Sequence, residues 1–291
     1  MSNRATYKCQ RIFLDSNRFS RILILDSIPE LEPQTAKNLL GDLQTVAKAN
    51  SPSPLIEYKR VESGDDLLTS LRVCRDEVAA GGMNPMLHIE CHGDEFGLEL
   101  ADGSALDWSQ LKAPMTELNI ATELNLMIAV AACTGGALAK MISMGDRAPF
   151  WGLIGPTCAL YPHQLERAYR ALYTTLLNTK SPMNAVAAMD AATKIPGSYW
   201  RTTAQGLFQK GCNNYKSLHC TEEMLDLRAA RMLSGLATRR PPPYPPAAQL
   251  KQRLLDIEPA AFERYRTTFF MADLFVGHRE RFDVAVAEPT L

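Results

Sequence analysis

Leu87–Gly93 (LHIECHG) and Leu126–Gly136 (LMIAVAACTGG) are the two stretches that decide the fold. In each of them a run of apolar residues predicts a buried strand that stops abruptly. His92 and Gly93 follow the first run, and Cys133 follows the second. If the two strands lie side by side and parallel, an imidazole and a thiol project from the same edge of one sheet. A base and a thiol nucleophile are the minimum that a cysteine hydrolase needs.

The two motifs resemble those of the caspase-like (clan CD) cysteine peptidases, in which one apolar run precedes His-Gly and another precedes Ala-Cys. Within that group the chain is most similar to the CHAT branch, named for caspases and their tetratricopeptide-linked relatives. The intervening FGLELADGSALDWSQL (96–111) resembles the CHAT segment after the histidine, and AACTGG is close to the branch's Ser/Ala-Cys-x-Thr-Gly. The resemblance covers roughly residues 20 to 195. It implies a caspase-like, mostly parallel α/β sheet of about six strands flanked by helices, with the His and Cys strands as neighbours.

Segments with the hydrophobic pattern of a strand alternate along the chain with segments that have the pattern of a helix, which predicts the same α/β class. Strands are expected at Arg21–Ser27, at 55–61 and at Met86–Cys91, with helices at 36–50 and 63–80 between them. A β-α-β-α-β order requires a parallel sheet with helices on both faces. Later elements are a hairpin at Asp102-Gly103, a helix from Trp108, a strand at Leu126–Ala132, a short helix at Ala137–Met144, a strand at Pro149–Gly155, helices over 165–176 and 181–193, and a sixth strand within 199–208.

The character of the chain changes near its last third. We expect an N-terminal arm over residues 1–20, a catalytic domain over 21–211 and a helical extension over 212–291 with a Pro-rich spacer at 239–246. The tail from 247 holds five of the ten phenylalanines. They form either a satellite core or a docking surface for a partner or substrate.

Composition favours a soluble cytoplasmic protein. The chain has 291 residues, 46% apolar content and a net charge of −1, from 31 basic and 32 acidic residues. This balance points to neither nucleic acid nor an anionic membrane as the main partner. No apolar run is long enough to span a bilayer, and the polar start lacks the apolar stretch of a signal peptide. Seven irregularly spaced cysteines indicate a reducing compartment.

The residue types at the two motifs suggest definite roles. Cys133 would attack a carbonyl carbon, while His92 would take the thiol proton and later protonate the leaving amine. The N–H groups of Gly93 and Cys133 would form an oxyanion hole, where each donor contributes roughly 3 kcal/mol. Gly135 would let the chain turn tightly after the nucleophile. The other cysteines are expected to pack in the core.

Two acids near the strand ends are candidates for a third, orienting group. Asp26, at the end of the first strand, is the best-placed acid, whereas Glu90 would lie deep in its strand. The resemblance implies that a dyad plus a backbone carbonyl is sufficient. Asp94 is a candidate pocket residue. Ala131 stands where several relatives carry an acid, which favours a small or apolar residue before the cleaved bond.

No cofactor and no metal are expected. LDSIPE follows the first strand in place of a Gly-rich phosphate loop. In HIECH the candidate ligands alternate between the two faces of a straight strand, so they cannot all reach one ion. The fragment Cys212, His219 and Cys220 lacks the usual CxxC knuckle.

The favoured function is therefore a cysteine endopeptidase. It would cleave a protein partner at a specific site through a thioacyl intermediate, with a second, regulatory protein partner as a further expectation. Family context suggests bacterial (antiviral) defence or programmed death. Two alternatives remain open: a catalytically latent caspase-like interaction module, and a flavodoxin-like ligand-binding domain.

Overall fold

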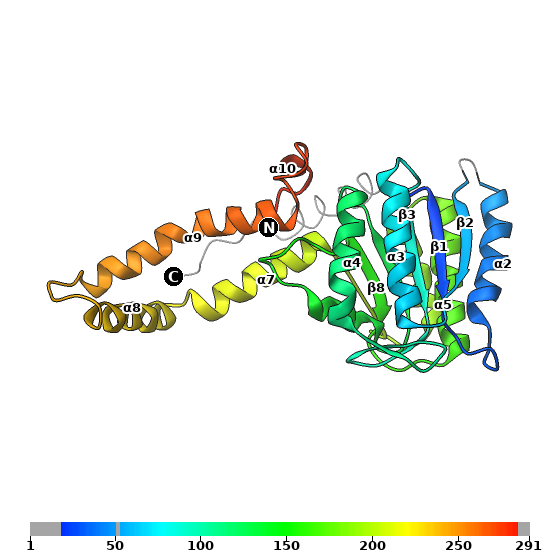
Figure 1. Ribbon diagram of the computed structural model, residues 1–291, viewed down its shortest axis with the longest axis horizontal. Coiled ribbons are helices and arrows are strands. Elements are labelled where there is room, and N and C mark those ends of the chain that lie inside the picture. The colour runs from blue at the N-terminus through cyan, green and yellow to red at the C-terminus, as the bar shows by residue number, and fades with distance from the viewer. Residues whose placement is uncertain (1–18, 51–52, 285–291) are drawn as a thin grey trace. The chain divides into compact units, whose positions relative to one another are not determined.

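The computed structural model describes residues 19–50 and 53–284 (Figure 1). Most of the expected N-terminal arm, 1–20, lies outside these ranges. The chain divides into two compact units. The first comprises the residues up to Ile142 together with Ala148–Thr203, and the second comprises Ser143–Arg147 together with the residues from Ala204 onward.

A six-stranded sheet forms the centre of the first unit. Its strand order is β2-β1-β3-β7-β8-β9. The first five strands are parallel, and β9 pairs antiparallel with β8. This confirms the predicted α/β class with a mostly parallel sheet. The strands are β1 (Arg21–Asp26), β2 (Leu55–Arg60), β3 (Pro85–Glu90), β7 (Met127–Ala131), β8 (Gly152–Pro156) and β9 (Tyr199–Thr203).

Helices cover both faces of this sheet, as the alternation of elements predicted. On one face α5 packs against both α2 and α6, and on the other α3 packs against α4 (Figure 1). Every residue of β1, β3 and β7 is buried, which explains their nearly continuous apolar sequences. The helices are α2 (Thr35–Lys48), α3 (Gly64–Ala79), α4 (Trp108–Ala121), α5 (Pro162–Thr179) and α6 (Pro182–Thr193).

A buried polar cluster lies on the face of the sheet that α2 and α5 cover. His88 Nδ1 lies 3.1 Å from the Tyr173 hydroxyl, and His88 Nε2 lies 3.0 Å from a Glu90 carboxylate oxygen. The other Glu90 oxygen accepts from the Thr35 hydroxyl. Buried polar groups require such partners. His88 is thus a satisfied core residue.

A second, antiparallel sheet follows β3 in the chain. It has the order β4-β5-β6, with β4 at His92–Gly93, β5 at Gly97–Glu99 and β6 at Ala105–Asp107. The predicted hairpin is present between β5 and β6, and Gly103 has a φ of 81° that a side chain would strain. The helix expected at Ala137–Met144 is instead a 3₁₀ helix, η1 (Gly135–Met141).

The boundary between the two units differs from the expected one. The sixth strand ends at Thr203, and α7 (Ala204–His219) begins directly after it. The buried residues Ala204, Phe208 and Cys212 are spaced four apart, which is the period of a helix face. The expected boundary between 211 and 212 therefore falls inside α7.

The second unit is helical, as predicted. It contains α7, α8 (Glu222–Ala237), α9 (Ala247–Phe269) and α10 (His278–Arg281), and α8 packs against α9. Four aromatic rings form its core, with neighbouring centroids 5.0–5.3 Å apart: Phe208, Phe269, Phe270 and Phe282. For Phe269, Phe270 and Phe282 of the tail the core interpretation holds. Within the described ranges no helix combines the length and the apolar character needed to cross a bilayer.

Candidate active site

The strands that carry the two motifs are neighbours. β3 and β7 pair in parallel, with Glu90 opposite Ala131. His92 and Cys133 each follow two positions later, beyond the carboxyl ends of these strands. Ligand-binding groups of open α/β sheets gather at this edge, and adjacent strands are about 4.8 Å apart. The fold thus brings the imidazole-bearing and thiol-bearing segments to the same edge, with the strand adjacency that the resemblance implied.

Gly93 packs directly against the segment that carries the thiol. A Cβ atom at Gly93 would lie 3.3 Å from the Cys133 carbonyl oxygen and 3.1 Å from the Ala132 Cβ. The Asp94 N–H donates to the Gly97 carbonyl at 3.0 Å. In the alternating pattern of an antiparallel pair, the N–H of Gly93 then points away from β5. The Gly93 N–H therefore takes no part in the β4–β5 ladder.

The chain turns sharply after Cys133. Thr134 has a φ of 52°, a left-handed conformation that is costly for a β-branched residue. Its hydroxyl donates to the Cys133 carbonyl at 2.7 Å, and the Gly135 N–H donates to the Ala132 carbonyl at 3.0 Å. A Cβ at Gly135 would lie 2.7 Å from Val130 Cγ1. Gly135 is therefore required for the close approach of this turn to Val130. The strained residue Thr134 directly follows the proposed nucleophile.

His92 contacts an acid that the sequence reasoning missed. Its Nε2 atom lies 3.0 and 3.1 Å from the two carboxylate oxygens of Glu32. Glu32 belongs to the loop between β1 and α2, and the two residues are 60 positions apart. Because β1 lies beside β3 in the sheet, this loop leaves the same edge as His92. The sequence does show an acid in the loop after β1. Only the order of the strands in the sheet, however, shows that this loop lies close to His92.

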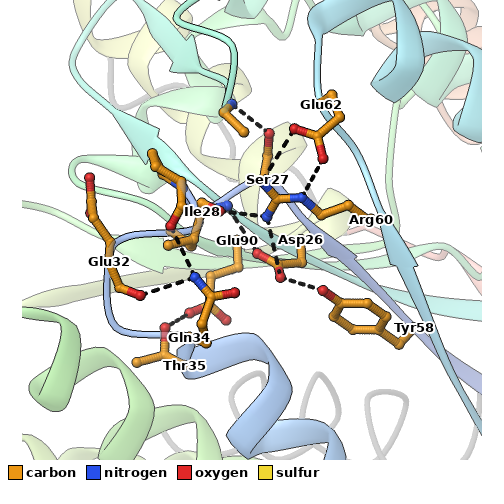
Figure 2. Close-up of polar contacts among 12 residues, drawn as sticks. Asp26, Ser27, Ile28, Glu32, Gln34, Thr35, Tyr58, Arg60, Glu62 and Glu90 are labelled. Atoms are coloured by element: carbon orange, nitrogen blue, oxygen red, sulfur yellow. Dashed lines mark hydrogen bonds and ion pairs between the residues drawn. The ribbon is translucent and has the colours of Figure 1, made fainter.

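Asp26, the sequence-based candidate for an orienting acid, is engaged elsewhere. Its side chain is fully buried. One carboxylate oxygen accepts from the Ile28 N–H at 2.9 Å, and the other accepts from the Tyr58 hydroxyl at 2.6 Å and lies 3.6 Å from Arg60 (Figure 2). Burial, followed by the hydrogen bond to Asp26, raises the pKa of Tyr58 well above its ordinary value, so this hydroxyl stays a donor. The structure brings Glu32, not Asp26, to His92.

Asp94 lies beside His92 and lines a cavity of about 570 Å³. Its carboxylate accepts from the N–H groups of Phe96 and Gly97, at 2.7 and 3.0 Å, and thereby shapes the β4–β5 turn. His92 and Gly93 line the same cavity, together with Phe96 and the carboxylate residues Glu99 and Asp107. Asp94 is therefore placed as a pocket residue.

The loop after β8 lies against the other side of the thiol segment. Cys133 Sγ lies 4.0 Å from the Leu160 carbonyl oxygen, and the Thr134 N–H donates to the Cys158 carbonyl at 3.3 Å. Cys133 is partly exposed, and Cys158 is exposed, so the expectation that Cys158 packs in the core is wrong. The proposed nucleophile is thus accessible and bordered by backbone.

Most of the other described cysteines are buried thiols. Burial raises the pKa of Cys74 and of Cys212, each to about 11. It also raises the pKa of Cys91 and of Cys220. A raised thiol pKa means little thiolate near neutrality, so these residues fit the packing role predicted for them. Cys9 lies outside the described residues.

Among the residues that the structure describes, no group of three or more His, Cys, Asp or Glu side chains could hold a metal ion. No protein-family model matches the chain, and no curated protein matches it.

Proposed function

We propose that the chain is a cysteine endopeptidase of the caspase-like, CHAT type that performs limited proteolysis of a protein partner. One observation carries the proposal. The parallel pairing of β3 with β7 sets His92-Gly93 and Cys133 at one sheet edge, with Gly93 against the Cys133 backbone. A role in bacterial defence or programmed death, under a regulatory partner, is the family-derived part of the proposal.

The first half of the reaction forms a thioester. The Cys133 thiol gives its proton to His92, and the sulfur attacks the carbonyl carbon of the scissile peptide bond. Negative charge develops on the carbonyl oxygen, where the N–H groups of Gly93 and Cys133 would stabilise it. His92 then returns the proton to the amine as the C–N bond breaks. The amine product leaves, and the acyl group stays on Cys133.

The second half regenerates the enzyme. His92 accepts a proton from a water molecule, whose oxygen attacks the thioester carbon. The C–S bond breaks, the carboxylic acid product leaves, and the Cys133 sulfur recovers its proton from His92. The same base and the same oxyanion donors serve both halves.

The proposed reaction takes place in a reducing cytoplasm, where the nucleophile remains a thiol. All six cysteines in the described part of the chain are free, which supports this assignment.

Peptide acyloxymethyl ketones test the mechanism, because a cysteine peptidase alkylates its own nucleophile with them. Two sets of probes are appropriate, one with a small apolar residue before the ketone and one with a basic residue. Ala131 favours the first, and the carboxylates that line the cavity beside His92 favour the second. We expect modification at Cys133 that is lost in His92→Ala and retained in Cys158→Ser. Modification that is independent of His92 would refute the mechanism.

The second candidate is the catalytically latent interaction module. It is favoured by apolar side chains that are exposed on the second unit: Leu218 (63%), Ile257 (63%) and Val276 (100%). Exposed apolar groups on a helical surface are typical of partner binding. The two candidates are separated by the probes, since a latent module would bind a partner without alkylation of Cys133.

A further inference from the structure

The contact between Glu32 and His92 is half-exposed. The His92 side chain is 44% exposed and the Glu32 side chain 38%. Water and salt weaken the attraction between two half-exposed charged groups. If the Glu32 side chain were on a flexible loop, the entropy lost on forming the contact would cancel most of this attraction. A functional contact at this position therefore requires a loop that holds the Glu32 backbone in place.

The start of that loop is held by the buried Asp26. This carboxylate accepts from the Ile28 N–H, and Arg60, which lies beside Asp26, donates to the Ile28 carbonyl (Figure 2). The Ser27 hydroxyl accepts from the Ala101 N–H at 2.9 Å, which ties the loop to the β5–β6 hairpin. Both backbone groups of Ile28 are thus satisfied by buried or half-buried side chains.

The middle of the loop is cross-linked by Gln34. Its side-chain amide donates to the carbonyls of Pro29 and Glu32, at 2.9 and 3.0 Å (Figure 2). The Glu32 N–H donates to the Pro29 carbonyl at 3.0 Å. Both backbone groups of Glu32 therefore have partners within the loop.

Glu90 holds both ends of the loop. Its carbonyl accepts from the Ser27 N–H at 2.7 Å, and its carboxylate accepts from the Thr35 hydroxyl. Glu90 lies two residues before His92, at the end of β3. The loop that carries Glu32 is thus anchored to the strand end that carries His92.

We propose that Glu32 is a positioning residue for His92, held in place by Asp26, Gln34 and Glu90. This inference rests on the proposed peptidase function. The Glu32 carboxylate can only accept, so the neutral imidazole donates from Nε2–H and keeps Nδ1 unprotonated. Nδ1 is then the nitrogen that receives the proton of the Cys133 thiol. The base is preset in one tautomer before substrate binds.

Nitrogen-15 NMR of the histidine side chains tests the tautomer without any need for catalysis. The chain has five histidines, and the spectrum of His92→Ala assigns the signal of His92. We expect a protonated Nε2 and an unprotonated Nδ1 in the wild type. Glu32→Gln should give a mixture of tautomers, since an amide can donate or accept. Gln34→Ala should shift the same signal in the same direction, and Glu30→Gln, in the same loop, should leave it unchanged.

Turnover gives the second readout. For Glu32→Gln we expect kcat to fall about tenfold, as part of the contribution of a general base is lost, with KM changed less than about twofold. An unchanged His92 tautomer in Glu32→Gln, or an equal shift in Glu30→Gln, would overturn the inference. A chain that cleaves nothing would refute the peptidase proposal instead, and the NMR result would still decide the role of Glu32.

Discussion

Glu90 and Ala131 lie opposite each other in the parallel register of β3 and β7, and each precedes a motif residue by two positions. Parallel strands run in the same direction, so His92 and Cys133 leave the sheet at one edge. In an antiparallel pair the two residues would lie at opposite strand ends, about 17 Å apart for five residues. The proposed chemistry therefore depends on strand order and direction.

Replacement of Gly93 by alanine should impair the oxyanion site more than the fold. The new Cβ would lie 3.0–3.3 Å from the Gly97 carbonyl, the Ala132 Cβ and the Cys133 carbonyl, so the Cys133 segment must shift. We expect a loss in kcat/KM of about 10²-fold and a loss in unfolding free energy of about 1–3 kcal/mol. Peptide hydrolysis and chemical denaturation measure the two effects.

Gly41→Ala is the matched control for that substitution. Gly41 lies in α2, and its added Cβ would contact nothing within 4 Å. The helix should gain about 0.5–1 kcal/mol from the better helix former, with unchanged activity. Equal activity in Gly93→Ala and Gly41→Ala would argue against the oxyanion role of Gly93.

Loss of the buried Asp26 carboxylate should destabilise the first unit. Asp26→Asn removes an ion pair with Arg60 and weakens the hydrogen bonds from Tyr58 and Ile28. We expect a loss of about 1–3 kcal/mol in unfolding free energy, because the hydrogen bonds to a fully buried acceptor are weakened. Urea denaturation measures this loss, provided that the m value is the same for the variant and the wild type.

Glu62→Gln provides the comparison for Asp26→Asn. Glu62 also pairs with Arg60, but its side chain is 56% exposed. An exposed pair contributes about 0.2–1 kcal/mol, so the loss should be small. Equal losses from the two substitutions would show that burial of Asp26 does not determine its contribution.

Thiol burial predicts the order of alkylation by iodoacetamide. Burial raises the pKa of Cys74 and Cys212 to about 11 and also raises that of Cys91, so at pH 7 these groups are almost wholly protonated and unreactive. Their reactivity should increase only as the pH rises toward those values. Cys158 and Cys133 should react first at neutral pH. Mass spectrometry of time points measures the order, and early modification of Cys91 would contradict its burial just after β3.

The sheet could be predicted because its central strands are apolar on both faces. RILILD in β1 and MIAVA in β7 are buried at every residue, and such runs bounded by helix patterns indicate parallel strands. The Asp102-Gly103 turn was predictable because its backbone needs a φ that glycine adopts freely. These features depend on local chemistry, which sequence reveals.

Contacts between distant segments were harder to predict. Glu32 reaches His92 across 60 positions, and no local pattern indicates that approach. The end of β9 at Thr203 was missed because β-branched and aromatic residues lead into a stretch whose four-residue period belongs to α7. Asp26 looked well placed at its strand end, yet Tyr58 and Arg60 on the neighbouring strand bind it.

Proteome-wide mapping of new amino termini tests the central claim most directly. Wild-type protein, Cys133→Ala and His92→Ala are incubated separately with a lysate of the source cells, and newly formed N-termini are labelled and sequenced. The proposed Cys–His mechanism predicts a small set of new termini with the wild type that both variants lose, while Cys158→Ser retains them. The same termini at undiminished yield with Cys133→Ala or His92→Ala would contradict it.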